Sequence, residues 1–282
     1  MKIKSFILTA VAAMLLTACG TTSTVPITGR KHTLLVDDAQ VLSLSKQQYS
    51  DVLKQSKLST NTTNTALVKR VGQRLATAVE NFLRTNGGQN DLQYYEWEFN
   101  LIQNTQVNAF CMPGGKICVY EGLLPVTKDE PSLAIVLGHE IAHAVAKHSA
   151  EQMSKQMRQQ YGTQIVGGLL GSALGDNAGQ LATAIAQSGF NFANLKYSRD
   201  NETEADYLGL IFAAMAGYDP QVAVAFWQRM AASSSQKPAE IFSDHPSDAS
   251  RIAALQKNMP VALQYYKPAT TTTTKTTTTK KK

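Results

Sequence analysis

One short motif constrains this chain of 282 residues more than its overall composition does. His139, Glu140 and His143 form an H-E-x-x-H pattern inside an apolar run that has the composition of a buried helix. Side chains four residues apart lie on one face of a helix, so the two imidazoles can bind the same metal ion. The neighbouring carboxylate of Glu140 can reach a water on that metal. The motif therefore predicts half of a zinc site together with its catalytic base.

A catalytic zinc ion needs a third protein ligand and one open position. Ser149 stands six residues after His143, which excludes the extended motif that has a third histidine there. On a continuous helix His148 would point about 140° away from His143. We therefore expect His148 either behind the ligands or on the surface, and not on the metal.

The missing ligand is expected in the acidic stretch around residues 202–206. Glu202 and Asp206 are four residues apart and share a helix face, whereas Glu204 is turned by about 200°. We expect Glu202 to bind zinc, and Asp206 to accept the free N–H of a ligating imidazole. Glu204 is the alternative ligand. Taken alone, the acids could instead be explained by the favourable dipole at a helix start.

The first 18 residues have the pattern of an export signal, with two lysines before an apolar run at residues 6–16. That run is shorter than the roughly 20 residues that span a bilayer. The sequence ending in Cys19 resembles a bacterial lipobox, which predicts lipidation at Cys19 and a lipid anchor to the membrane. Gly20 then favours an outer-membrane lipoprotein facing the periplasm. Residues 19–35 are expected to be the lipidated tether.

Residues 36–262 are expected to form a single domain, and the Thr- and Lys-rich residues 263–282 a disordered tail. Of the 27 Lys and Arg residues, two lie in the signal and four in the last 15 residues, and neither segment contains an acid. The body of the chain is therefore formally neutral. A basic pI of about 9.1 is no sign of a nucleic-acid partner.

Hydrophobic periodicity predicts an α+β fold, mostly helical, with a small antiparallel sheet beside the active-site helix. Helices are expected at residues 37–57, 64–85, 131–160, 200–216, 219–233 and 247–257, and strands at 93–102, 107–110 and 117–120. The Gly- and Ala-rich segment 162–189 is expected to pack between helices, with docking on a membrane or partner as the alternative.

Cys111 and Cys118 flank a predicted two-residue turn at Gly114-Gly115. Such a turn would place the two cysteines opposite each other across a pair of strands. They could then form a disulfide, or remain free as small apolar side chains.

Four motifs in order resemble those of metallopeptidase family forty-eight, which includes the HtpX-type and CAAX-protease-type zinc peptidases. They are Asn108-Ala-Phe with Pro113-Gly-Gly, the helix from Gly138 to His143, the stretch from Ser198 to Asp206, and His245-Pro246 followed by Arg251. The resemblance covers about residues 35–260. It implies a zincin-like fold with one Zn²⁺ per chain. No membrane-spanning helix is expected, and in this respect the chain is similar to the periplasmic lipoprotein branch of that family.

The resemblance implies a zinc-dependent metalloendopeptidase of the bacterial envelope that hydrolyses peptide bonds in misfolded or misassembled proteins. Glu140 would take the proton of the attacking water. His245 and Arg251 are candidate donors to the oxyanion, with a metal-capping role as the alternative for His245. Substrate is expected to add to a sheet edge near residues 106–111. The alternative function is an envelope chaperone or scaffold in which peptide binding matters more than cleavage. The oligomeric state is left open.

Overall fold

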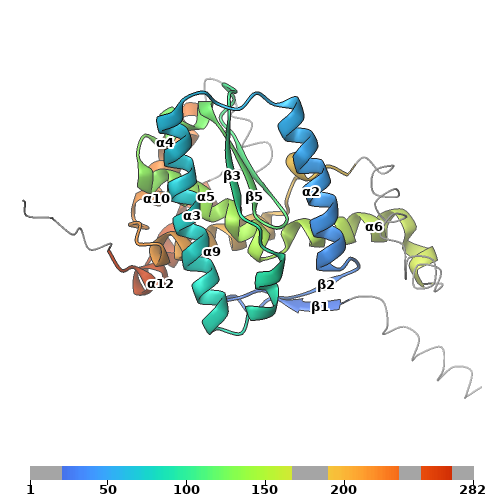
Figure 1. Ribbon diagram of the computed structural model, residues 1–282. Helices are drawn as coiled ribbons and strands as arrows, with labels where there is room; N and C mark the ends of the chain where they lie inside the picture. The colour runs from blue at the N-terminus through green and yellow to red at the C-terminus, as the bar shows by residue number, and fades with distance from the viewer. Residues whose placement is uncertain (1–20, 167–189, 235–248, 269–282) are drawn as a thin grey trace, which may run out of the picture.

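The computed structural model describes residues 21–166, 190–234 and 249–268, and confirms the mostly helical α+β fold (Figure 1). Its elements in chain order are β1 (Thr21–Thr24), β2 (Lys31–Leu34), α2 (Asp38–Gln55), α3 (Thr62–Thr85), η2 (Gln89–Tyr94), β3 (Glu98–Ile102), β4 (Ala109–Met112), β5 (Lys116–Tyr120), η3 (Glu121–Leu123), α4 (Leu124–Thr127), α5 (Glu130–Val145), α6 (His148–Val166), η4 (Phe192–Asn194), α9 (Arg199–Met215), α10 (Val222–Ser234) and α12 (Ala249–Tyr265). Among these elements no helix is long and apolar enough to cross a bilayer.

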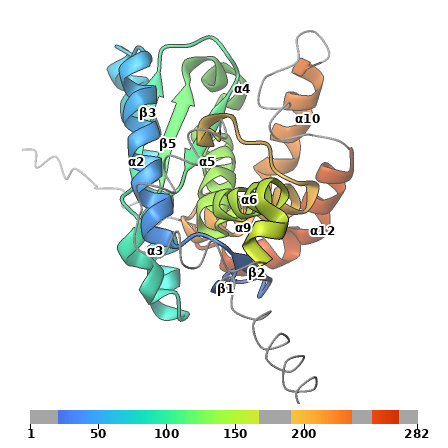
Figure 2. The same cartoon turned by 90° about the vertical axis from the view of Figure 1, so that its right-hand side faces the viewer.

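The main sheet has three strands in the order β3-β5-β4. Strands β4 and β5 form the expected antiparallel hairpin, while β3 pairs with β5 in parallel. Strand β4 is an edge strand, and η4 and α5 pack against it. Figure 2 shows α2, α3 and the sheet on one side of α5, with α10 and α12 on the other. Helix α5 is therefore central, which explains its almost wholly apolar sequence.

Two stretches differ from the predicted elements. The expected strand at 93–102 begins as the 3₁₀ helix η2, and only its second half forms β3. Most of the segment 162–189 lies outside the described residues, so its packing is untested.

The register of the β4–β5 hairpin corrects the expected placement of the cysteines. The loop contains three residues, 113–115, rather than two, which shifts the pairing by one position. Cys118 lies opposite Phe110, and Cys111 lies opposite Ile117. Because neighbouring strand positions point to opposite faces, the two cysteines belong to different core clusters. Both are buried and free, and burial raises the pKa of Cys118 to about 12.

The helix that carries the H-E-x-x-H motif is shorter than predicted. Helix α5 ends at Val145 and a new helix begins at His148. Between them Lys147 has a positive φ of 55°, a conformation that is costly for a residue with a long side chain. Its ammonium group donates to Asp38 and Asp91, which holds it there. The break redirects the chain, so the angle expected for His148 on a continuous helix does not apply.

The N-terminal segment belongs to the folded body. Residues 21–34, within the expected tether, form the antiparallel pair β1–β2, which packs against α6. Val25, His32 and Leu34 are buried there. At the other end α12 extends to Tyr265, three residues into the expected tail. The apolar positions of the N-terminal segment explain the difference, because their burial favours docking over an extended tether.

Helices α5 and α9 are in close backbone contact at a pair of glycines. A Cβ atom built on Gly138 would lie 2.7 Å from the carbonyl oxygen of Gly209. A Cβ atom on Gly209 would lie 2.6 Å from the backbone nitrogen of His139. Both contacts are with backbone, which cannot rotate away. Glycine is therefore required at both positions for the two helices to lie in contact.

We predict that Gly209→Ala destabilises the protein by about 1–3 kcal/mol, because the added methyl forces the two helix backbones apart. Thermal and urea unfolding would measure this loss. Thr203→Ala, on the exposed face of α9, is the matched control and should change stability little. Equal stability of Gly209→Ala and Thr203→Ala would show that the helices can separate without cost.

Candidate metal centre and active site

Three buried side chains from two helices converge on one point. His139 and His143 come from α5 and Glu202 from α9, and their ligand atoms all lie within 4.8 Å of one another. The Nε2 atoms of the two histidines are 3.0 Å apart; that of His139 lies 3.4 Å from Oε2 of Glu202, and that of His143 lies 3.4 Å from Oε1. Two zinc ligands with bonds of about 2.0–2.1 Å at a tetrahedral angle are separated by about 3.3 Å. The cluster therefore fits a zinc ion.

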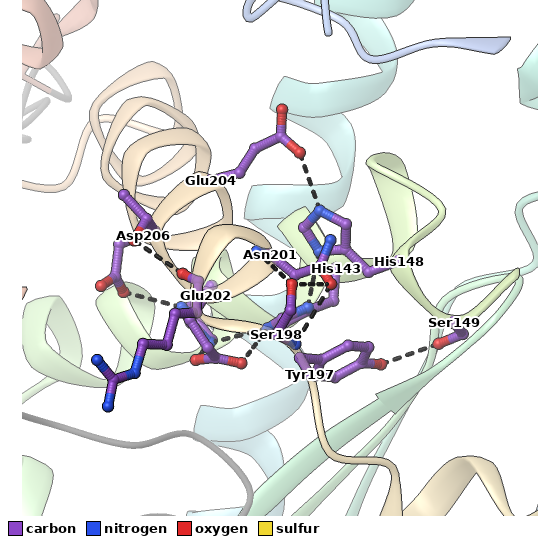
Figure 3. A network of polar contacts seen from close by, with 12 residues as sticks. His143, His148, Ser149, Tyr197, Ser198, Asn201, Glu202, Glu204 and Asp206 are labelled. Atoms are coloured by element: carbon purple, nitrogen blue, oxygen red, sulfur yellow. Dashed lines mark hydrogen bonds and ion pairs between the residues drawn. The ribbon is translucent and has the colours of Figure 1, made fainter. Parts of the chain in front are cut away.

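Local sequence fixes where the third member of this cluster lies. Ser198 caps α9 by accepting from the backbone N–H of Asn201, and the side chain of Asn201 returns to the Ser198 backbone in a capping box. This defines the first turn of α9. Glu202 is in that turn and faces α5 (Figure 3).

His139 is held from behind by a carboxylate. Its Nδ1 lies 3.0 Å from Oδ1 of Asp206. Burial lowers the pKa of His139, but its contacts with Asp206 and Glu202 outweigh this and raise the pKa to about 9. Metal coordination requires the neutral imidazole, so a bound cation competes with that proton. The expected pairing of Asp206 with a ligating histidine thus has the right geometry.

Arg251 is placed differently from the expected oxyanion donor. Its Nη2 donates to Asp206 Oδ1 at 2.6 Å, its Nη1 lies 3.8 Å from Glu202, and its guanidinium stacks 3.6 Å over the ring of Trp227. These contacts point the guanidinium at the carboxylates that support the histidines. The geometry therefore favours a role in orienting Asp206 and Glu202. His245, the other candidate donor, lies outside the described residues.

His143 is also supported from behind, by His148 and by Tyr197. His148 is fully buried, and its Nδ1 lies 2.9 Å from Nδ1 of His143. The ring of Tyr197 stacks on His143 with centroids 3.9 Å apart, and its hydroxyl hydrogen-bonds Ser149 (Figure 3). The surface location considered for His148 is excluded. Tyr197 carries no motif of its own, although it directly precedes the serine that caps α9.

Glu204 does not join the three-residue cluster. One of its oxygens lies 3.0 Å from Nε2 of His148, and the same carboxylate accepts from Thr28 and Arg30 in the β1–β2 hairpin. Arg30 also forms a bidentate pair with Glu151 on α6. The metal cluster is thereby connected to the N-terminal hairpin by a chain of polar contacts.

Glu140 is almost fully buried on α5, directly after the first histidine of the motif. After burial itself, its charge is among the causes that raise the pKa values of Cys111 and Tyr197. The buried carboxylate is therefore within electrostatic reach of Cys111 on β4 and of Tyr197. A pocket lined in part by His143, Tyr94 and Tyr95 lies beside the C-terminal part of the same helix.

Comparison with known proteins agrees with this geometry. Residues 63–259 match Peptidase family M48. The chain belongs to that family. M48 metalloproteases are zinc-dependent, and their zinc requirement matches the His-His-Glu cluster described above. The family recognised from the four sequence motifs is thus confirmed.

Several curated relatives are similar to this M48 chain. Mitochondrial metalloendopeptidase OMA1 of Schizosaccharomyces pombe is 35% identical over 177 residues, 62% of this chain and 49% of the relative. Metalloendopeptidase OMA1, mitochondrial, of Homo sapiens is 31% identical over 245 residues, 85% of this chain and 46% of the relative. The Beta-barrel assembly-enhancing protease of Yersinia pestis is 32% identical over 161 residues, 56% of this chain and 33% of the relative. The chain spans about half the length of these relatives or less.

The comparisons overturn the predicted location. The two OMA1 relatives align with 62% and 85% of this chain, and their names place those proteins in mitochondria. The bacterial relative from Yersinia pestis aligns with a smaller share of this chain, 56%. The expectation of an outer-membrane lipoprotein facing the periplasm is therefore wrong. It depended on a short N-terminal pattern that lies outside the residues 63–259 matched by the family. Residues 1–20, including Cys19, lie outside the described residues, and lipidation there is untested.

We predict that zinc stabilises the native protein by about 4 kcal/mol when free zinc exceeds the dissociation constant 1,000-fold. Calorimetry with added zinc and with chelator would measure the shift. Glu202→Ala should remove most of it by deleting one of three ligands. Glu98→Ala, a carboxylate on β3, is the control and should keep it. Loss of the zinc shift in Glu204→Ala but not in Glu202→Ala would mean that the wrong carboxylate has been assigned.

We also predict that Glu151 makes stability depend on pH between about 4.5 and 2. Burial raises its pKa, but His32 and Arg30 outweigh this and lower the pKa from 4.5 to about 2. A lowered folded-state pKa stabilises the protein above pH 4.5, and this stabilisation is lost as the pH falls through that window. Glu151→Gln should therefore be less stable at neutral pH and lose less stability on acidification. Urea unfolding at several pH values, with Asp51→Asn as the exposed control, measures the difference; parallel curves would contradict it.

Proposed function

We propose that this protein is a zinc metalloendopeptidase that cleaves misfolded or misassembled proteins. The observation that carries the proposal is the buried cluster of His139, His143 and Glu202, in which one ligand atom from each residue lies within 4.8 Å of the others. Its two Nε2 atoms are 3.0 Å apart, and each lies 3.4 Å from a different oxygen of the carboxylate, spacings that suit ligands of one tetrahedral ion. Two imidazoles and one carboxylate, with the fourth position left for water or substrate, are the donor set of catalytic rather than structural zinc sites.

When bound, zinc supplies Lewis acidity to the scissile carbonyl and lowers the pKa of a water towards about 7. Glu140, on the same helix as the two histidines, takes the proton of that water and passes it to the leaving amine. Asp206 holds the imidazole of His139 in orientation. Arg251 in turn donates to Asp206 and packs against the ring of Trp227. Its contacts therefore support a role in orienting Asp206.

The substrate class rests on relatives and on the sheet. The name Beta-barrel assembly-enhancing protease in Yersinia pestis and Escherichia coli refers to protein assembly, which supports misassembled proteins as substrates here. Strand β4 is at the edge of the sheet and packs against α5, so an extended peptide added beside it would run past the metal-binding helix. Backbone pairing of this kind tolerates many sequences. The proposal concerns the substrate class and no compartment.

We predict that Glu140→Gln lowers the rate of casein cleavage by about 10²–10⁴-fold, because the water loses its general base while the metal ligands remain. Cleavage is measured on the zinc-loaded protein, and zinc content by metal analysis. Glu130→Gln, in the first turn of the same helix, is the control and should cleave at nearly the wild-type rate.

Two results would contradict the proposal in different ways. Undiminished cleavage by Glu140→Gln would show that another group is the base. Wild-type protein that binds casein and zinc but leaves the casein intact would favour the chaperone or scaffold function instead.

A further inference from the structure

The support behind His143 differs from the support behind His139. His139 contacts a carboxylate, Asp206, directly. His143 instead contacts a second histidine, His148, which contacts the carboxylate of Glu204. Both carboxylates come from α9, and Figure 3 shows the contact between Glu204 and His148.

Hydrogen-bond chemistry fixes the protons along this chain of contacts. An ionised carboxylate only accepts, so the Nε2 of His148 that faces Glu204 at 3.0 Å must carry a hydrogen. A neutral imidazole has one donor and one acceptor, so Nδ1 of His148 is then an acceptor. The Nδ1 of His143, 2.9 Å away, must donate to it. That leaves the lone pair of His143 on Nε2, the atom that faces His139 and Glu202.

The carboxylate of Glu204, at the end of this series of contacts, is itself held in place. Thr28 donates to one oxygen of Glu204 at 2.6 Å, and Nε of Arg30 donates to the other at 2.7 Å. Two further nitrogens of Arg30 bind both oxygens of Glu151 at 2.9 and 3.0 Å. Arg30 directly precedes β2 in the β1–β2 hairpin. From there it contacts Glu204 on α9 and Glu151 on α6, two helices that are far away in the sequence.

We propose that His148 is a positioning residue for the metal site, which fixes His143 in the tautomer that presents Nε2 to zinc. Glu204 sets the tautomer of His148, and Arg30 of the N-terminal hairpin holds Glu204 for that purpose. The hairpin is therefore an outlying part of the metal centre. This inference rests on the proposed function in one respect, namely that His143 binds zinc.

The test measures the affinity of the purified full chain for Zn²⁺ alone, by competition with a fluorescent chelator. His148→Leu removes the acceptor, and we expect the dissociation constant to rise by 10–100-fold, as for other partners behind zinc ligands. His148→Gln keeps an amide acceptor and donor and should recover much of the affinity. Arg30→Gln should weaken binding by a smaller factor. Arg70→Gln removes an Arg–Glu pair elsewhere, with Glu130, and should leave the dissociation constant unchanged.

A double-mutant cycle separates positioning from simple packing. If His148 and Glu204 act in series, adding Glu204→Gln to His148→Leu should weaken zinc binding little further, whereas independent packing effects would multiply. Unfolding in the presence of chelator reports the stability of each variant without metal. A purely structural role would lower that stability in His148→Leu and leave zinc affinity unchanged.

Failure of the positioning role can be distinguished from failure of the proposed metal site. Wild-type protein that does not bind zinc, or Glu202→Ala that binds it as tightly as wild type, overturns the metal site itself. Tight zinc binding by wild type together with equal affinity in His148→Leu overturns only the positioning role. If His148→Leu does not fold, equal affinities of Arg30→Gln and Arg70→Gln overturn it.

Discussion

The contact between α5 and α9 is the constraint on which the rest of the site depends. It is close because glycines face each other at positions 138 and 209, where a Cβ atom on either would strike backbone. Each helix supplies only part of a metal centre, two imidazoles from one and one carboxylate from the other. In this structure the two backbones nearly touch, and three ligand atoms from the two helices lie within 4.8 Å of one another. Dense packing of an apolar core is thus what turns two short motifs into one site.

Helix α9 supplies three carboxylates at alternate positions, and each has a different partner. Glu202 lies between the two histidines of the motif, and Asp206 lies behind the first of them. Glu204 points to another side of the helix, as helical geometry requires, yet it too is connected to the cluster. The connection exists because the chain breaks at Lys147 and turns His148 back toward His143. One strained residue therefore brings a third carboxylate into the same network.

Features governed by local pattern could be predicted, and features governed by register or by chain reversal could not. The apolar periodicity of α3 and the buried run of α5 define those helices almost without regard to the rest of the molecule. The cysteines on β4 and β5 show the opposite case. One additional loop residue moved Cys111 and Cys118 to opposite faces of the sheet, because side chains alternate along a strand. Turn length depends on how the hairpin packs, which the sequence alone does not show.

By itself the sequence determined which candidate donors share a helix face, because H-E-x-x-H spacing and the i, i+4 spacing of Glu202 and Asp206 are properties of single helices. It left open whether Glu202 or Glu204 joins the two histidines, and the packing of α9 on α5 places Glu202 there. The sequence also determined the family, through motifs that have an order along the chain. Only the tertiary structure decided which distant groups support those donors. Arg251 on Asp206, Tyr197 on His143, and Arg30 on Glu204 are separated from their partners by 45 to 174 residues. Contacts of that separation arise from packing of whole elements, and no local periodicity encodes them.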